Sequence, residues 1–252
     1  MRTYLKYWTI AIIAGLILWG CEPAYDSKMF TIDKKIVVDG WIENGRSAIV
    51  MLTYNTPYFG NLDSASFRQL VATRAKVSVT DGVNTEILTL TKDTNYFPPY
   101  VYKGYSLIGE VGKTYALIVE DELDTVIAVT SILPPVQLDS IWFESTSDSS
   151  GIIKCILDDN PTEKNYYRIF TRIQGKEHRF YPALVANLND RFFNGQRFTF
   201  YINKGRTNNI LPIENIYFPK KDTIIVRFTT MDELAFEYWR TYDEELLNAG
   251  NP

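Results

Sequence analysis

The chain has 252 residues, a formal charge of −4 and 46% hydrophobic side chains, which is enough for a large core. A mildly acidic protein lacks the basic face that neutralises phosphates, so the composition argues against nucleic-acid binding. One histidine and two cysteines also argue against a zinc site of the usual type.

The first twenty residues have the layout of a secretory signal. Two basic residues precede an uncharged apolar run, residues 7–19, which is shorter than the roughly 20 residues that span a bilayer. Leu18-Trp19-Gly20-Cys21 then places an aliphatic residue three before a cysteine and a small residue just before it, as lipoprotein signals do. We predict a signal peptide over 1–20 and lipid on Cys21. The alternative is a signal anchor with a chance cysteine.

Without residues 1–20 the chain keeps 24 basic and 30 acidic side chains, a formal charge of −6. Residues 21–34 are predicted to be a polar tether, held at the membrane by the two or more acyl chains that stable anchoring requires. Glu22 beside Cys21 resembles the surface-export signal of Bacteroidota lipoproteins. We therefore expect a protein anchored in the outer membrane and exposed at the cell surface.

Short β-branched segments then follow one another without a helical period. Strands are predicted over residues 35–43, 47–54, 75–80, 86–90, 115–120 and 125–131. Asn44-Gly45 and Asp81-Gly82 are hairpin turn signals. This pattern predicts an N-terminal β-sandwich domain over residues 35–133. Pro134-Pro135 predicts a stiff linker after it, because neither proline can donate to a strand ladder.

The second half continues the strand pattern and then changes. Strands are predicted over residues 140–144, 151–157, 165–173, 176–181, 197–202 and 222–229, with a long loop over 204–219. Thr230 and Glu233 form a capping box. Leu234, Tyr238, Tyr242 and Leu246 recur every fourth residue, with Ala235 and Trp239 alongside, and predict an amphipathic helix whose aromatic face packs on the second sandwich. The fold expected is mainly β: two immunoglobulin-like β-sandwich domains in tandem, the second over 137–252 with a C-terminal amphipathic helix.

Residues that could carry catalysis or bind a metal are few. His178 lies among charged residues, so a catalytic role is disfavoured. Cys155 lies in an apolar strand and is predicted to be a buried thiol. Asp158-Asp159-Asn160 could ligate calcium, but an acidic pair before a proline is more often a turn. We therefore predict no catalytic residue, no metal site and no cofactor. The 30 acidic residues neither support nor exclude the paired carboxylates of a glycosidase.

Aromatic residues give the best candidates for a binding site. Five of them surround Pro98-Pro99: Tyr96, Phe97, Tyr100, Tyr102 and Tyr105. Planar rings on a loop can stack on sugars or anchor a protein partner, so these five are candidate contacts for a ligand or partner. The alternative, which the sequence favours, is packing in the core and at sheet edges.

The order of several motifs along the chain resembles a known family, the Bacteroidota outer-membrane lipoproteins catalogued as domain of unknown function 4249. The motifs are the signal ending in Cys21, then Val37-Val38-Asp39-Gly40-Trp41-Ile42-Glu43-Asn44-Gly45, Leu52-Thr53, Pro57-Tyr58-Phe59, Ala75-Lys76-Val77-Ser78-Val79-Thr80-Asp81-Gly82, Pro134-Pro135, Leu138-Asp139-Ser140-Ile141-Trp142-Phe143, Asn165-Tyr166-Tyr167-Arg168, Asn189-Asp190, Phe193-Asn194-Gly195 and Tyr238-Trp239-Arg240. Such proteins usually continue past Pro252, so the resemblance implies that the second domain is truncated here.

The resemblance implies no activity that can be transferred. Members typically occur beside TonB-dependent outer-membrane receptors, which implies an accessory role in nutrient uptake by association only. Our leading hypothesis is a non-catalytic outer-membrane lipoprotein that binds such a receptor or its nutrient. The alternatives are a lipid-anchored carbohydrate-binding module, with a glycan or peptide as ligand, and, third, a hydrolase.

Overall fold

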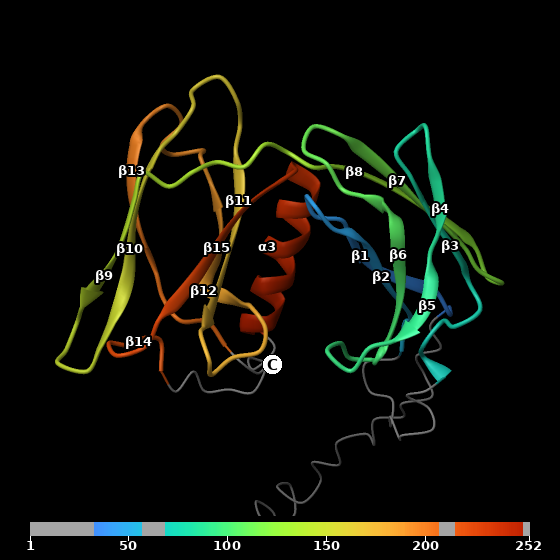
Figure 1. Cartoon of the computed structure of the whole chain (residues 1–252), viewed down its shortest axis with the longest axis horizontal. Coiled ribbons are helices and arrows are strands. Elements are labelled where there is room, and N and C mark those ends of the chain that lie inside the picture. The colour runs from blue at the N-terminus through green and yellow to red at the C-terminus, as the bar shows by residue number, and fades with distance from the viewer. Residues whose placement is uncertain (1–32, 57–68, 207–214, 249–252) are drawn as a thin grey trace, which may run out of the picture. The chain divides into compact units, whose positions relative to one another are not determined.

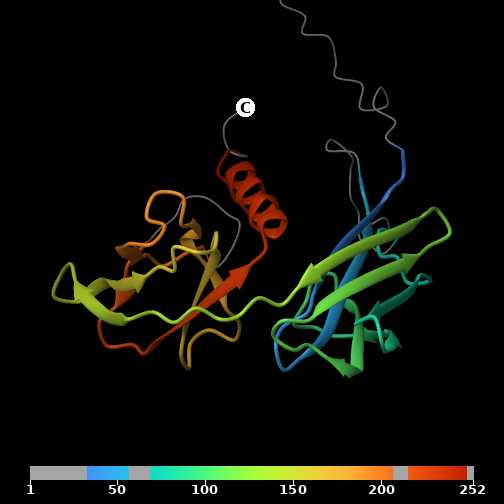
Figure 2. The ribbon, with the colours of Figure 1, turned by 90° about the horizontal axis from the view of Figure 1, so that it is seen from above.

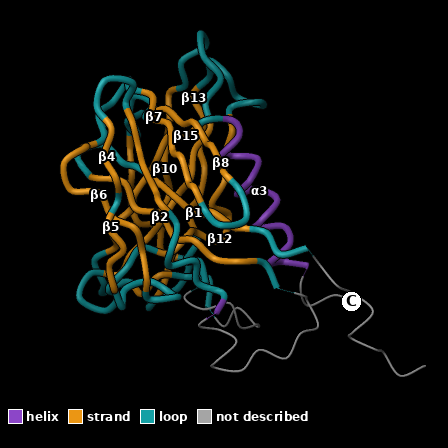
Figure 3. Tube along the Cα trace, turned by 90° about the vertical axis from the view of Figure 1, so that its right-hand side faces the viewer, coloured by secondary structure: helices purple, strands orange, loops and turns teal. Residues whose placement is uncertain are grey.

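The computed structural model describes residues 33–56, 69–206 and 215–248. Strands make up most of this part of the chain (Figure 3). The elements are β1 (Ile36–Trp41), β2 (Ser47–Tyr54), β3 (Lys76–Thr80), β4 (Thr85–Ile87), β5 (Thr89–Lys92), β6 (Tyr100–Ile108), β7 (Thr114–Glu120), β8 (Thr125–Ser131), β9 (Ser140–Ser145), β10 (Ser150–Asp158), β11 (Tyr166–Ile173), β12 (Tyr181–Asn189), β13 (Arg197–Ile202), β14 (Phe218–Pro219), β15 (Ile224–Met231) and α3 (Glu233–Asn248).

The first eight strands form two antiparallel sheets, which we call the first sandwich. One sheet has the order β1-β2-β6-β5 and the other β4-β3-β7-β8 (Figure 1). In the letters used for immunoglobulin-like domains these orders are A-B-E-D and C′-C-F-G. Figure 2 shows the last two strands of the second sheet, β7 and β8, as a long antiparallel pair in green and yellow-green.

Alternation of small apolar and polar residues gives these strands one buried face. Val77 and Val79 of β3 and Tyr115 and Val119 of β7 are at most 3% exposed, as expected when every second side chain points between two sheets. A Cβ placed on Gly40 of β1 would lie 3.6 Å from a methyl carbon of Leu117 in the other sheet. The two sheets therefore meet closely at this point.

The described residues divide into two compact units, one with residues 33–38, 52–56 and 69–73 and the other with residues 39–51, 74–206 and 215–248. In the first unit the backbone N–H of Ala72 donates to the carbonyl of Leu52, and that of Tyr54 donates to Leu70. The segment before β3 therefore runs along the end of β2. The domain boundaries expected from the sequence stay a prediction.

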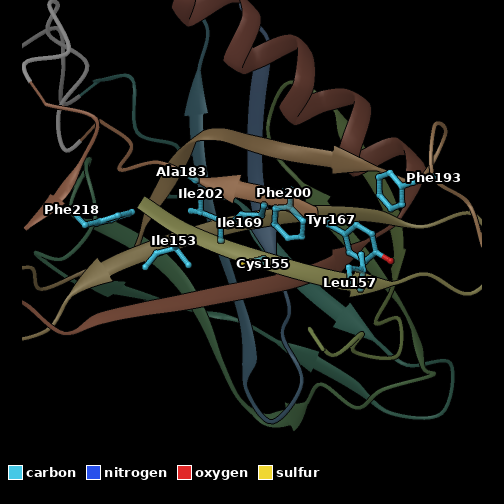
Figure 4. Packing of buried hydrophobic residues seen from close by; sticks show 10 residues of the cluster. All are labelled: Ile153, Cys155, Leu157, Tyr167, Ile169, Ala183, Phe193, Phe200, Ile202 and Phe218. Atoms are coloured by element: carbon cyan, nitrogen blue, oxygen red, sulfur yellow. The ribbon is translucent and has the colours of Figure 1, made fainter. Parts of the chain in front are cut away.

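The later strands form the second sandwich. One of its sheets places β10 between β9 on one side and β13 and β14 on the other, and its second sheet has the order β12-β11-β15. Its core is a cluster of buried residues from both sheets, shown in Figure 4: Ile153, Cys155, Leu157, Tyr167, Ile169, Ala183, Phe193, Phe200, Ile202 and Phe218. The mainly β fold with two sandwiches and a C-terminal helix is thus confirmed.

The helix α3 packs on the face of β11 and β12 that points away from the core cluster, and in Figure 4 it lies apart from that cluster. Phe236 is 3% exposed and its ring lies 5.1 Å from that of Tyr166. The predicted row was wrong in its direction, since Leu234, Tyr238 and Tyr242 are 81%, 56% and 41% exposed. Trp239, which was predicted to lie alongside this row, does face the sheet, where the guanidinium of Arg168 lies 4.2 Å from its ring centroid, and the buried residue beside it is Phe236.

Several predicted boundaries also shift. The helix is capped by Asp232, whose carboxylate accepts the N–H of Ala235 at 2.8 Å, because β15 continues through the predicted cap Thr230. The predicted strand over 86–90 divides into β4 and β5, which belong to different sheets. The predicted strand over 176–181 is irregular up to residue 180, with β12 beginning at Tyr181, and β6 and β12 were not predicted.

Candidate functional site

Four of the five predicted aromatic residues reach the surface. Phe97, Tyr100 and Tyr105 are 76%, 38% and 64% exposed, and Tyr96 is half-buried. Tyr102 is only 3% exposed, because it alternates on β6 to face the core beside Val50, its neighbour on β2. As a contact residue Tyr102 is corrected to a core residue.

The exposed rings lie beside a charged pair on the β1-β2-β6-β5 sheet. We call this group the aromatic surface and define it by Trp41, Asp93, Tyr96, Phe97, Lys103 and Tyr105. The ring centroids of Trp41 and Tyr96 are 5.7 Å apart. The ammonium of Lys103 lies 5.9 Å from the Tyr96 ring centroid, and the Tyr105 hydroxyl lies 3.3 Å from that of Thr91.

The loop that carries Tyr96 and Phe97 is fixed by Asp93. One carboxylate oxygen of Asp93 accepts the backbone N–H and the side-chain amide of Asn95, at 3.0 and 2.9 Å. The other accepts the ammonium of Lys103 at 2.5 Å. The backbone N–H of Asp93 donates to the carbonyl of Pro99, which closes the loop. Phe97 is therefore exposed on a loop with defined hydrogen bonds at both ends.

The charged pair holds both partners ionised. The hydrogen bond from Lys103 lowers the pKa of Asp93, with a further contribution from Asn95. The hydrogen bond to Asp93 raises the pKa of Lys103. The side chains of Lys103 and Asp93 are 25% and 15% exposed, so the pair lies at the base of the surface rather than at its rim. The arrangement offers flat rings around a polar centre, which suits binding of a polar ligand with apolar faces.

The chain belongs to the family described as Domain of unknown function (DUF4249). The family model matches residues 23–252. No curated protein matches. Among solved structures, the two-fibronectin type-III domain segment from chicken tenascin is 11% identical, with 78% of this chain and 100% of that chain covered and a TM-score of 0.20. The fold assignment rests on the strand pairing described above.

Several motif residues of this DUF4249 chain stabilise the fold. Asp190 is 4% exposed and accepts the backbone N–H of Asn165 at 2.7 Å. Gly195 has a φ of 70°, and a Cβ on it would lie 2.7 Å from Pro161. Its N–H donates to the buried carboxylate of Asp159 at 3.0 Å. These residues join two loops at one end of the second sandwich.

The same contacts involve the acidic pair Asp158 and Asp159, which the sequence analysis placed in a turn. Asp159 is 8% exposed and accepts hydrogen bonds from Gly195 and from the hydroxyl of Tyr167, while Asp158 pairs with Arg197 at 2.8 Å. Asp159 is thus held within the chain, whereas Asp158 is the last residue of β10 and its pair with Arg197 lies at the surface. Among residues 33–56, 69–206 and 215–248 there is no group of three or more His, Cys, Asp or Glu side chains that could hold a metal.

Three further residues were singled out in the sequence. Cys155 and His178 can be compared with the structure, and Cys21 cannot. Cys155 is fully buried, and burial raises the pKa of its thiol to about 12, so it is a core residue. His178 is exposed. Cys21 lies outside the described residues, and its lipidation stays a prediction. In the described part of the chain no helix is long and apolar enough to cross a membrane.

Sequence reasoning missed three members of the aromatic surface: Trp41, Asp93 and Lys103. Trp41 was placed on a strand but not linked to the loop, which is more than fifty residues away. Asp93 and Lys103 are ten residues apart, and one signal was available, since a loop rich in proline and aromatic residues between an acid and a base suits closure by an ion pair.

Proposed function

We propose that this chain is a non-catalytic binding lipoprotein of the Bacteroidota outer membrane. Lipid on Cys21 anchors it at the cell surface, and it serves as an accessory to a TonB-dependent nutrient receptor. The aromatic surface is the contact site for the receptor or for the nutrient. Support for the anchor comes from the sequence motif ending in Cys21, and support for the role comes from the family resemblance.

One structural observation carries the binding role. Phe97 and Tyr105 are 76% and 64% exposed, yet they belong to a loop and strand that Asp93 and Lys103 hold in place. Exposed aromatic residues on a rigid support lose little conformational entropy on binding, and such residues dominate the energy of many interfaces.

The test is a gentle detergent pull-down of the tagged full-length protein from its native outer membrane, read by mass spectrometry. We expect a TonB-dependent receptor in stoichiometric amount. The double variant Phe97→Ala with Tyr105→Ala should lose at least about 90% of it, since hot-spot truncations cost about 2 kcal/mol or more each. Phe192→Ala is the matched control, because Phe192 is 86% exposed on the second sandwich. An equal yield of receptor with the double variant would reject the assigned surface.

A carbohydrate-binding module is the second candidate, favoured by the grouping of Trp41, Tyr96 and Tyr105 around the Lys103–Asp93 pair. Rings stack on sugar faces and the charged pair offers hydrogen bonds to hydroxyls. The variant Tyr96→Ala with Tyr105→Ala should abolish binding on a glycan array, with Phe192→Ala unchanged. Tyr102 is unsuitable for this test because its truncation would open a core cavity. Absence of glycan binding by the unaltered protein would leave the accessory role as the proposal.

A further inference from the structure

Two aromatic residues and a lysine form a row across one sheet of the second sandwich. Lys154 on β10 is in register with Trp142 on β9 and with Tyr201 on β13, and these strands are neighbours in one sheet (Figure 1). Residues in register point to the same face of a sheet. Ile153 and Cys155, on either side of the lysine, belong to the core cluster, so the row lies on the outer face. We call Trp142, Lys154 and Tyr201 the ring row.

The ring row is open to solvent. Trp142 and Tyr201 are 39% and 47% exposed. The helix α3 packs on β11 and β12, which belong to the other sheet of this sandwich. The ammonium of Lys154 lies 5.4 Å from the ring centroid of Trp142 and 5.5 Å from that of Tyr201, so a charge lies between the two rings. A ligand can therefore reach both rings and the ammonium from one side.

The charge of the ring row is balanced within the sheet. The carboxylate of Glu144, also on β9, lies 3.4 Å from the ammonium of Lys154. A hydrogen bond to Tyr201, followed by one to Glu144, raises the pKa of Lys154, so the ammonium stays charged. Because the two charges offset each other, a strongly charged ligand gains little net attraction here. Hydroxyl groups suit the pair, since a hydroxyl can accept from an ammonium or donate to a carboxylate.

The spacing of the rings limits the shape of the ligand. Trp142 and Tyr201 lie two strands apart, which is about 9–10 Å and close to the length of two hexose units in an extended β-1,4-linked chain. Successive units of such a chain are turned over, so every second unit presents the same face. A sugar face carries C–H groups that stack on aromatic rings. A chain that crosses the strands can therefore stack its first and third units on the two rings.

We propose that the ring row binds an uncharged, extended glycan with β-1,4 links, which lies across β9, β10 and β13. Two sugar units stack on Trp142 and Tyr201, and hydroxyls of the unit between them hydrogen-bond to Lys154 and Glu144. An α-1,4-linked chain coils instead of lying flat, so it meets only one ring at a time. This site lies on the second sandwich, and the proposal does not depend on the aromatic surface of the first.

The first measurement is calorimetric titration of the full chain, purified in detergent, with β-1,4-linked hexamers of glucose, mannose and N-acetylglucosamine. We expect at least one of them to bind at least about tenfold more tightly than the α-1,4-linked hexamer of glucose. A trisaccharide of the same type reaches both rings and a disaccharide does not, so the third unit should tighten binding at least about tenfold. The proposal fails if none of the three hexamers binds, or if disaccharide and trisaccharide bind equally.

The second measurement assigns the binding to the ring row. Trp142→Ala and Tyr201→Ala should each weaken the affinity for the bound hexamer at least about tenfold, because each removes one stacking contact. Trp142→Phe keeps a ring and should stay within about threefold of the unaltered protein. Two controls should leave the affinity unchanged: Phe192→Ala, which removes a ring that is 86% exposed on the same sandwich, and Tyr96→Ala with Tyr105→Ala on the aromatic surface.

The variants also separate this site from the aromatic surface. Unchanged affinity in either Trp142→Ala or Tyr201→Ala overturns the proposal. Loss of binding in Tyr96→Ala with Tyr105→Ala alone would assign the glycan to the aromatic surface, as in the second candidate function above, and would equally overturn it. If Trp142→Phe binds as weakly as Trp142→Ala, the ring is not the contact, and the ring row is rejected as a glycan site.

Discussion

The two sandwiches share a strand order but are completed differently. In the described residues the C′-C-F-G sheet of the first sandwich has β8 beside β7, and in the second sandwich the chain passes from β15 into the helix α3, which packs on the face of the C′-C-F sheet. The core-facing Tyr115 and Val119 of β7 are 2% and 0% exposed, whereas the core-facing side chains of β15 are half-buried. Among the described residues, β15 is therefore followed by a helix on the face of its sheet, whereas β7 is followed by a strand that pairs with it.

The polar groups that hold the last elements also differ. In the first sandwich Glu86 and Tyr115 hydrogen-bond to backbone groups. In the second sandwich Arg168, which is 2% exposed, joins the sheet to the helix. It donates to both carboxylate oxygens of Asp243, at 2.9 and 3.3 Å, and to Asn187 at 2.6 Å. Its guanidinium lies 4.2 Å from the ring centroid of Trp239. A strand needs only backbone ladders and local anchors, but a helix on a sheet face needs side-chain contacts of this kind.

The largest expected loss of stability comes from breaking the contact between Arg168 on the sheet and Asp243 on the helix. Asp243→Ala removes the carboxylate and leaves a buried guanidinium without its counter-charge, which costs about 3 kcal/mol of unfolding free energy. The estimate is at the low end of the usual range because the Asp243 side chain is 28% exposed. Urea denaturation followed by tryptophan fluorescence measures the loss, since Trp239 lies on the guanidinium. The double variant Arg168→Met with Asp243→Leu should recover most of it.

The matched control on the same helix is Arg240→Ala. Arg240 pairs with Glu237 and Glu244 at 2.7 Å in each case, but all three side chains are at least 40% exposed. Exposed helix pairs contribute about 0.3–0.5 kcal/mol. If Asp243→Ala is as mild as this control, the helix is not held by the buried pair, and the contrast between the two sandwiches fails.

The next largest expected loss of stability comes from removing the carboxylate of Glu86 in the first sandwich, and it depends on pH. The carboxylate of Glu86 on β4 accepts the backbone N–H groups of Tyr105, Ser106 and Leu107, at 2.6, 2.9 and 2.8 Å. Burial raises the pKa of Glu86, but these three donors outweigh it and hold the pKa below the ordinary 4.5. Since the folded state has the lower pKa, the stabilisation is present above the unfolded pKa and is lost as the pH falls through the folded pKa.

Glu86→Ala should therefore cost about 2–3 kcal/mol at pH 7. The difference between this variant and the unaltered protein should shrink as the pH falls below 4.5. Chemical denaturation at a series of pH values measures it. The control Glu122→Gln changes a side chain that is 77% exposed and should have little effect at any pH. A Glu86 difference that stays constant down to pH 3 would contradict the role of the charge.

Strand positions were mostly predictable, because alternation and turn residues act locally. β2, β8 and β13 match their predicted spans over 47–54, 125–131 and 197–202. β6 was missed because its aromatic residues suggested a binding loop rather than a strand whose alternate residues are buried. β12 was missed because nothing local marks it, and its pairing with β11 decides it.

The face of the helix and the make-up of the candidate site depend on contacts that are distant in sequence. The row Leu234, Tyr238 and Tyr242 has the correct helical spacing, yet it is exposed because the buried Arg168 attracts Asp243 and Trp239 to the sheet. A single sequence cannot show that a residue seventy-five positions away is buried and charged. The aromatic residues of the site were visible locally, but their partner Trp41 was not.

The smallest expected loss of stability comes from changing Tyr115, at the start of β7, the F strand of the first sandwich. The hydroxyl of Tyr115 accepts the N–H of Glu110 at 2.8 Å and donates to the carbonyl of Ile108 at 3.4 Å. This is the tyrosine corner of immunoglobulin-like domains, and β15 of the second sandwich begins with Ile224 instead. Tyr115→Phe leaves one backbone donor unpaired and should cost about 1–2 kcal/mol, measured by thermal or urea denaturation. The control Tyr105→Phe changes a ring that is 64% exposed and should cost under about 0.5 kcal/mol. If both variants unfold at the same denaturant concentration, the hydroxyl of Tyr115 adds nothing to the stability of the first sandwich.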